Sequence, residues 1–186
     1  MNVRQSRVAA SVQTWVEDVV VELNLCPFAR RELIGGRVHI AESRATQTEH
    51  VLVDLETEIQ RLLADDAIET TLLVLPHALP DFNDFNQFLD LADGLLQHMQ
   101  LTGVLQLAHF HPDYRFADTD PGDAENFTNR SPYPILHLLR ESSLDRVLRS
   151  TEHAEQIPTR NIELMNALGA DEMRSRLARC CAVADD

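Results

Sequence analysis

The hydrophobic pattern in the middle of the chain constrains its fold more than any other feature. Short, mainly apolar runs at residues 37–43, 68–76 and 103–111 predict three strands. The segments between these runs repeat apolar residues every three or four positions, which predicts one helix capped by Thr48 and another capped by Asp81. Strands that alternate with helices across short connections are typical of a parallel sheet. The pattern therefore predicts an α/β fold with a small, mainly parallel sheet flanked by helices.

The flanking segments extend this prediction to the rest of the chain. Apolar residues at helical spacing predict an amphipathic helix that ends before Pro27. After Pro112 the pattern stops for about twenty residues, and short helices are then predicted near Pro134, Ser143, Arg160 and Ala170. No repeat, low-complexity tract or linker divides the sequence. Residues 1–186 are therefore predicted to form a single α/β domain with a C-terminal helical segment.

Composition limits the classes of partner. Sixteen basic residues, all of them arginine, stand against 30 acidic ones, and the formal net charge is -14. Because phosphate-rich partners require a basic face, nucleic acid and anionic membranes are not expected to bind. No apolar run approaches the roughly 20 residues of a membrane span, and no signal peptide is visible. The three cysteines show no disulfide framework and fit a reducing compartment, so we expect a cytoplasmic protein.

One long polar segment, from His109 to Pro134, has the pattern of neither a helix nor a strand. It begins where the third predicted strand ends, and ligands of open α/β sheets bind at the carboxyl ends of the strands. Loops of this length without secondary structure are usually functional or disordered, and the aromatic residues of this segment argue against disorder. The segment is therefore predicted to form one wall of a site at this edge of the sheet.

His109 and His111 are the first candidate site residues. They are two positions apart, so on an extended chain both rings project from the same face and can share a metal ion or a substrate group. A metal would need a further ligand, for which His137 is a candidate, and zinc, manganese or iron would suit such a set. Two alternatives stay open. One is acid and base catalysis completed by Glu125, and the other is a hydrogen-bonded core histidine beside a solvent-facing one.

A second group of candidates follows in the same segment. Arg130 offers a planar fork suited to a carboxylate or phosphate, and Asn126 and Asn129 can orient the bound group. Together with Tyr133, these residues predict a binding site for a small anionic molecule. The alternative is a structural loop in which the asparagines bind turn backbone and Arg130 pairs with an acidic residue.

Cys26 is the third candidate. In the stretch NLCPFARR it precedes a proline and basic residues, a context that resembles the start of the first helix of thioredoxin-like transferases, where the pKa of a thiol is lowered. The chain departs from that family, because a helical pattern precedes Cys26 and no second cysteine follows at CxxC spacing. A reactive thiol, a buried apolar cysteine and a metal or haem ligand are the alternatives.

Three sequence blocks together resemble the bacterial family catalogued as domain of unknown function 1415. They are WVEDVVVELNLCPFA (Trp15 to Ala29), ETTLLVLPHALPDFNDFNQFLDLAD (Glu69 to Asp93) and AHFHPDYRFADTDPGDAENFTNRSPYPILHLLRE (Ala108 to Glu141). The resemblance implies a family and no activity, so the chemistry has to be argued from the residues.

These observations favour an enzyme that acts on a small anionic metabolite at the sheet edge. In this hypothesis His109 and His111 bind a divalent metal or act as acid and base, and Arg130 holds the substrate anion. A second hypothesis is a non-catalytic metal or haem carrier that uses Cys26 and the histidines. The third is a thiol-dependent redox enzyme centred on Cys26.

Overall fold

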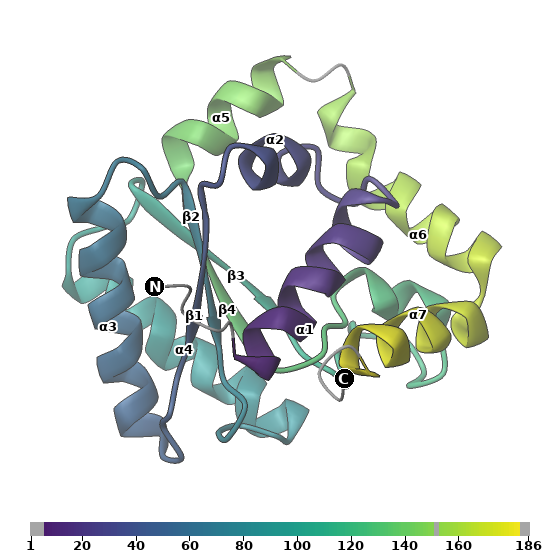
Figure 1. Cartoon of the computed structure of the whole chain (residues 1–186), viewed down its shortest axis with the longest axis horizontal. Helices are drawn as coiled ribbons and strands as arrows, with labels where there is room; N and C mark the ends of the chain where they lie inside the picture. The colour runs from purple at the N-terminus through teal and green to yellow at the C-terminus, as the bar shows by residue number, and fades with distance from the viewer. Residues whose placement is uncertain (1–5, 151–152, 183–186) are drawn as a thin grey trace.

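A computed structural model describes residues 6–150 and 153–182 of the protein. A four-stranded sheet lies between two layers of helices (Figure 1). The strands are β1 (Val38–Glu42), β2 (Thr70–Val74), β3 (Leu105–Phe110) and β4 (Ile135–Arg140). None of the helices in this part of the chain combines the length and the apolar composition that a membrane span requires.

The order of the strands across the sheet is β1-β2-β4-β3, and β1 pairs with β2 in parallel. β4 runs antiparallel to both β2 and β3, so β1, β2 and β3 point in the same direction. The predicted α/β fold with a small sheet between helices is confirmed. The sheet is mixed rather than mainly parallel, because the apolar residues after Pro134, predicted to begin a helix, form β4 between two of the predicted strands.

One face of the sheet is covered by α3 (Thr48–Ala64) and α4 (Phe82–His98). Both helices are confirmed, but α3 begins at Thr48 itself with Gln47 at the N-cap position, so the predicted Thr48 cap is wrong. The Asp81 carboxylate caps α4 by accepting hydrogen bonds from the main-chain N–H groups of Asn83 (2.8 Å) and Asp84 (3.1 Å). The apolar stripes of both helices pack on alternate residues of the strands and form a continuous core.

The opposite face is covered, near the carboxyl ends of β1, β2 and β3, by N- and C-terminal helices. The chain begins as α1 (Arg7–Trp15) and continues as a π-helix, η1 (Val16–Val21). The C-terminal helices are α6 (Ile157–Leu168) and α7 (Ala170–Ala182), which contact the short 3-10 helix η2 (Ala124–Thr128). These elements enclose a second hydrophobic core.

Two further helices, α2 (Ala29–Ile34) and α5 (Glu141–Ser150), lie at the top of Figure 1. α2 precedes β1 and α5 continues directly from β4, so both lie near the amino ends of β1 and β2. A 3-10 helix, η3 (Ala154–Gln156), leads into α6, and Gly169, with a φ of 82°, separates α6 from α7. The short helices predicted near the C-terminus are therefore confirmed.

Candidate functional site

The predicted polar segment forms a loop, residues 111–134, at the carboxyl edge of the sheet, and we call it the polar loop. Asn126, on η2, is fully buried within it. Its amide oxygen accepts hydrogen bonds from the Phe116 N–H group (3.0 Å) and the Thr119 hydroxyl (2.8 Å), and its amide nitrogen donates to the Asp120 carbonyl (2.8 Å). The Asn126 amide therefore holds the loop together, and both of its polar atoms bind groups of the loop.

Asn129 connects the polar loop to the end of β3. Its main-chain carbonyl accepts a hydrogen bond from the His111 N–H group (3.2 Å), and its side-chain amide donates to the His109 carbonyl (3.3 Å). Tyr133 packs against the second core. Glu125 lies on η2 and is partly buried. The contacts of Asn129 and Tyr133 are those of a structural loop, the alternative that the sequence left open.

Arg130 binds the polar loop itself. Its Nε donates to the Tyr114 carbonyl (3.2 Å) and its Nη2 donates to the Pro121 carbonyl (2.7 Å). The guanidinium carbon lies 4.5 Å from the centre of the Phe127 ring, and burial lowers the pKa of Arg130. The main-chain carbonyl of Arg130 accepts a hydrogen bond from Trp15 Nε1 (3.1 Å). The loop is thereby tied to α1, and the predicted anion clamp is occupied by the protein's own backbone.

His111 is fully buried against aromatic rings of α4. Its Nδ1 accepts a hydrogen bond from the Asp113 N–H group (3.0 Å), which leaves Nε2 to donate to the Leu79 carbonyl, 3.2 Å away. Burial lowers the pKa of His111 and keeps the ring neutral. Both ring nitrogens are used by the main chain, so this imidazole offers no lone pair to a metal ion.

His109 and His137 lie on opposite faces of the sheet. In the β3–β4 pair His137 stands opposite Ala108, the neighbour of His109, and successive side chains of a strand alternate between the faces. His109 stacks on Tyr114 on the α4 side, with 5.6 Å between ring centres, and burial lowers its pKa. The sheet therefore separates His137 from His109 and from His111, both of which contact Phe85 of α4. Within the described part of the chain, no group of three or more His, Cys, Asp or Glu side chains is placed to hold a metal ion.

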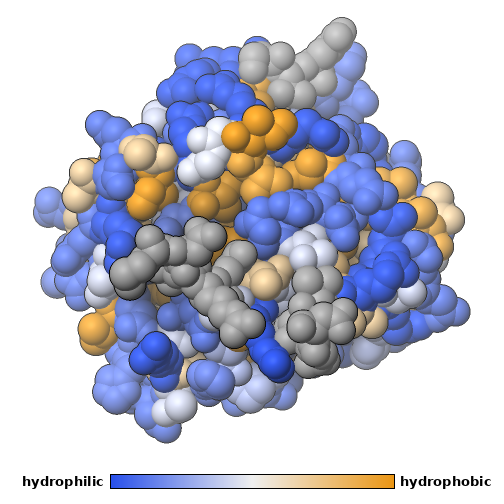
Figure 2. All heavy atoms as spheres, viewed as in Figure 1, coloured by the Kyte–Doolittle hydropathy of each residue, from blue (hydrophilic) through white to orange (hydrophobic). Residues whose placement is uncertain are grey.

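The face of the sheet opposite α3 and α4 carries a pocket, which we call the sheet-face pocket. Apolar side chains supply most of its lining: Trp15, Val16, Val20, Phe28, Ala29, Val38, Leu72, Ala108, Phe110, Leu139, Leu144 and Val147. Among polar residues, Cys26, Thr70 and His137 also line it. Figure 2 shows hydrophobic residues gathered in the upper middle of the molecule, between hydrophilic ones, where the same view in Figure 1 has α2 and α5.

The sheet-face pocket lies toward the amino ends of β1 and β2, away from the edge at which the sequence predicted a site. Val38 and Thr70 are the first residues of these strands, and both line the pocket. α6, α7 and the polar loop pack together at the carboxyl edge, so this part of the sheet is left to α1, η1, α2 and α5. The lining comes from segments far apart in the sequence, and no motif spacing marks it. The one sequence signal is that Cys26, Thr70 and His137 each fall in one of the three blocks that carry the family resemblance.

His137 is held in one neutral form. The Thr70 hydroxyl donates its single hydrogen to the Leu138 carbonyl (2.7 Å), so its oxygen can only accept from His137 Nε2, which lies 2.6 Å away. His137 Nδ1 therefore carries a lone pair, and it has no hydrogen bond within the described residues. Burial lowers the pKa of His137 to about 4, so the ring is neutral at pH 7. An imidazole in this state can accept a hydrogen bond from a ligand.

Cys26 lines the same pocket, between η1 and α2. Burial raises the pKa of its thiol, although the main-chain N–H groups of Phe28 and Ala29 act in the opposite direction. The thiol form therefore predominates at neutral pH. A reactive cysteine needs a cation, a metal or a helix N-terminus that outweighs burial, and here burial has the larger effect on the pKa of the thiol.

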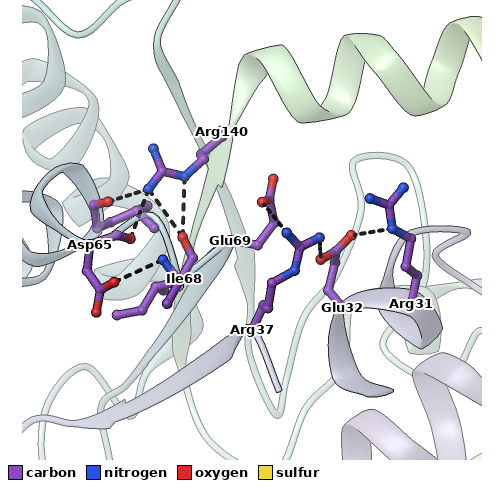
Figure 3. Close-up of polar contacts among 9 residues, drawn as sticks. Arg31, Glu32, Arg37, Asp65, Ile68, Glu69 and Arg140 are labelled. Atoms are coloured by element: carbon purple, nitrogen blue, oxygen red, sulfur yellow. Dashed lines mark hydrogen bonds and ion pairs between the residues drawn. The ribbon is translucent and has the colours of Figure 1, made fainter. Parts of the chain in front are cut away.

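Arginines and glutamates form a chain of ion pairs at the rim of the sheet-face pocket (Figure 3). Arg37 lies between two carboxylates: it pairs with Glu32, and its Nη1 lies 3.5 Å from Glu69 Oε2. Arg31 Nε lies 3.4 Å from Glu32 Oε1. Arg140, also at the rim, donates hydrogen bonds to main-chain carbonyls at the end of α3. Both rim carboxylates are thus paired with arginine.

Comparison with known families gives one match. The model of a family described as a protein of unknown function, DUF1415, matches residues 7–175. The match covers the sheet, the core that α3 and α4 form with it, and every residue of the sheet-face pocket. No curated protein and no solved structure matches the chain.

Proposed function

Because the chain belongs to the DUF1415 family, whose description assigns no activity, we propose a function from its own residues: it binds a small, mainly apolar molecule in the sheet-face pocket. The observation that carries this proposal is the neutral His137, with an unused acceptor at Nδ1, in a lining that is otherwise mostly apolar. Ligand sites commonly have this character, a concave apolar surface with a few polar groups that orient the ligand.

The shape of the N-terminal helix supports the same proposal. Val16 and Val20 line the sheet-face pocket from η1, where the helix is wound as a π-helix. π-helical turns are rare and occur frequently at functional sites, since each widens the helix and changes which side chains face a neighbouring surface. Apolar surface is also unfavourable in contact with water. A ligand that covers it would gain about 25 cal/mol for each Å² of apolar surface that it buries. Both features favour a site that a ligand covers.

The contacts of the candidate residues support the functions considered from the sequence to different degrees. An enzyme that works through the polar loop lacks support, because Asn126, Arg130 and His111 bind the protein's own backbone. A thiol-dependent redox enzyme lacks support because burial raises the pKa of the Cys26 thiol. A metal or haem carrier would need Cys26 and His137 without His109, which faces α4. Binding of a small apolar molecule requires only the apolar lining and the neutral His137 that the pocket presents.

The single tryptophan of the chain, Trp15, lines the sheet-face pocket and provides a direct test. We expect the neutral dye N-phenyl-1-naphthylamine to bind with about one site per chain, quenching Trp15 emission by energy transfer. Ala108→Phe should abolish this binding, because the new ring fills the pocket. Gln106→Phe is the matched control, since Gln106 lies on the same face of β3, is exposed and does not line the pocket. Equal dye binding by both folded variants would contradict the proposal.

A further inference from the structure

We propose that the ligand of the sheet-face pocket is an amphipathic anion, with its apolar part inside the pocket and its carboxylate at Arg140 and Arg146 on the rim. The inference rests on the proposed function and identifies the class of ligand. It keeps the small anionic partner that the sequence predicted and moves its binding site from Arg130 to the other end of the sheet.

Arg146 is the first residue that supports a rim site for an anion. It lies on α5, is exposed and lines the sheet-face pocket. Within the described part of the chain it has no ion pair, whereas Arg149 on the same helix pairs with Asp145, 3.6 Å away. The Arg146 guanidinium is therefore available at the rim for an anion from solution.

Arg140 adds a second positive charge at the same rim. Its Nε and Nη2 donate to main-chain carbonyls, among them that of Ile68 at 3.4 and 3.2 Å, which carry only partial negative charge. Nη1 makes no hydrogen bond among the described residues, and Figure 3 shows no contact drawn to it. No carboxylate of the described residues lies within ion-pair distance of Arg140. Its hydrogen bonds hold the guanidinium in place and leave one nitrogen for a ligand.

The carboxylates of the rim do not cancel this charge. Glu32 and Glu69 are both paired with Arg37, and Glu32 also with Arg31. The rim therefore has a net positive charge on a protein whose formal net charge is -14. Such a local reversal of sign attracts an anion to this place, because opposite charges within a few ångströms interact more strongly where protein excludes water.

The chemistry inside the pocket sets the direction of the ligand. His137 Nδ1 presents a lone pair, and a carboxylate presents only lone pairs at neutral pH, so the two groups repel. The apolar lining around Leu72 and Phe110 also offers nothing to replace the water around an ion. An anionic ligand therefore keeps its charge at the rim and places its apolar end over the sheet.

Octanoate and its neutral methyl ester test this inference, because they share an apolar chain and differ in charge. At low salt we expect octanoate to displace N-phenyl-1-naphthylamine with an apparent affinity about five- to tenfold higher than that of methyl octanoate. The reason is that only the carboxylate makes charged hydrogen bonds to the arginines. The advantage should shrink as salt is added. Arg146→Gln should remove it, and Arg149→Gln, one turn further along α5, should leave it unchanged.

The outcomes separate the two proposals. If octanoate and its ester compete equally, or if neither displaces bound dye, the anionic ligand is overturned while pocket binding stands. The same holds if Arg146→Gln and Arg149→Gln have equal effects. If the dye itself fails to bind the parent protein, or binds the Ala108→Phe variant as well, the proposed function is overturned. Thermal unfolding of each variant establishes that it is folded before binding is compared.

Discussion

Asn126 shows at the scale of a single residue why the chemistry of the polar loop was hard to interpret. An asparagine beside an arginine in a long loop has the same sequence appearance whether it orients a ligand or satisfies loop backbone. Its three hydrogen bonds and complete burial are those expected of the second role. Arg130 follows the same rule, because its donors bind main-chain carbonyls. Residue type left a binding site and a structural loop as alternatives, because it does not predict which partners these side chains find.

Asn126→Ala should destabilise the fold by about 2 to 3 kcal/mol, because Phe116 N–H and the Asp120 carbonyl would lose their buried partner. The exposed Asn86 of α4 provides a matched substitution, Asn86→Ala, which should change stability by less than about 0.5 kcal/mol. Urea unfolding of both variants measures the difference. A fully stable Asn126→Ala protein that had lost ligand binding would instead favour the predicted substrate-binding role.

His137 makes stability depend on pH. Its pKa is about 4 in the folded protein and near 6.5 when the chain is unfolded, so the unfolded state takes up a proton first as the pH falls. The folded protein should therefore lose stability progressively from about pH 6.5 down to pH 4, by up to about 3 kcal/mol from this residue. Above pH 6.5 His137 should contribute no pH dependence.

His137→Gln should flatten this part of the pH profile, since glutamine does not titrate and can still donate to Thr70. Burial also lowers the pKa of His109 and His111. In the parent and in His137→Gln alike, these two residues therefore also make the free energy of unfolding fall as the pH falls. His98→Gln, at an exposed position near the end of α4, is the control. Urea unfolding between pH 4.5 and 7.5 measures the free energy of unfolding at each pH. If it changes with pH equally in the parent and in His137→Gln, the lowered pKa of His137 is contradicted.

At the scale of elements, helices were predicted well because their signals are local and repeat over many residues. α4 has 17 residues, an apolar stripe and an Asp81 cap, and each of these is visible in the sequence. β4 has 6 residues, with apolar side chains at consecutive positions. Such a short run fits a strand or one and a half turns of helix equally well, and only its neighbours in the sheet decide.

Two glycines at helix positions allow a paired test of backbone conformation. An added Cβ would meet no atom within 4 Å at either Gly94 or Gly169, so steric contact is not a factor. Gly169 has φ 82° and ψ 155°, a conformation that residues with a side chain rarely adopt, while Gly94 lies inside α4. Gly169→Ala should therefore destabilise the protein by about 1 to 3 kcal/mol. Gly94→Ala should stabilise it by up to about 1 kcal/mol. Thermal melts of the two variants should shift in opposite directions, and a shared direction would contradict the assignment.

At the scale of the whole molecule, the direction of the strands was predictable and the place of the pocket was not. The predicted site required that β1, β2 and β3 end at one edge of the sheet and that this edge be open to a ligand. The three strands do end at the same edge. That edge is closed by the polar loop and by α6 and α7, elements whose docking leaves no periodic signal in the sequence. The pocket arises where this covering stops, so it depends on long-range packing rather than on any local motif.

The position of β4 has a consequence for how the chain reaches its folded state. β4 is the last strand in the sequence, yet it lies between β2 and β3 and pairs with both. Until residue 140 has left the ribosome, β3 has no partner strand in the sheet and β2 has one open side. The growing chain therefore carries unpaired strand edges through most of its synthesis, and these are the surfaces on which nascent proteins aggregate. Closing the sheet from its centre also requires contacts between residues far apart in sequence, which slows folding. We infer that sheet closure is the late step of folding and the stage at which a chaperone would matter most.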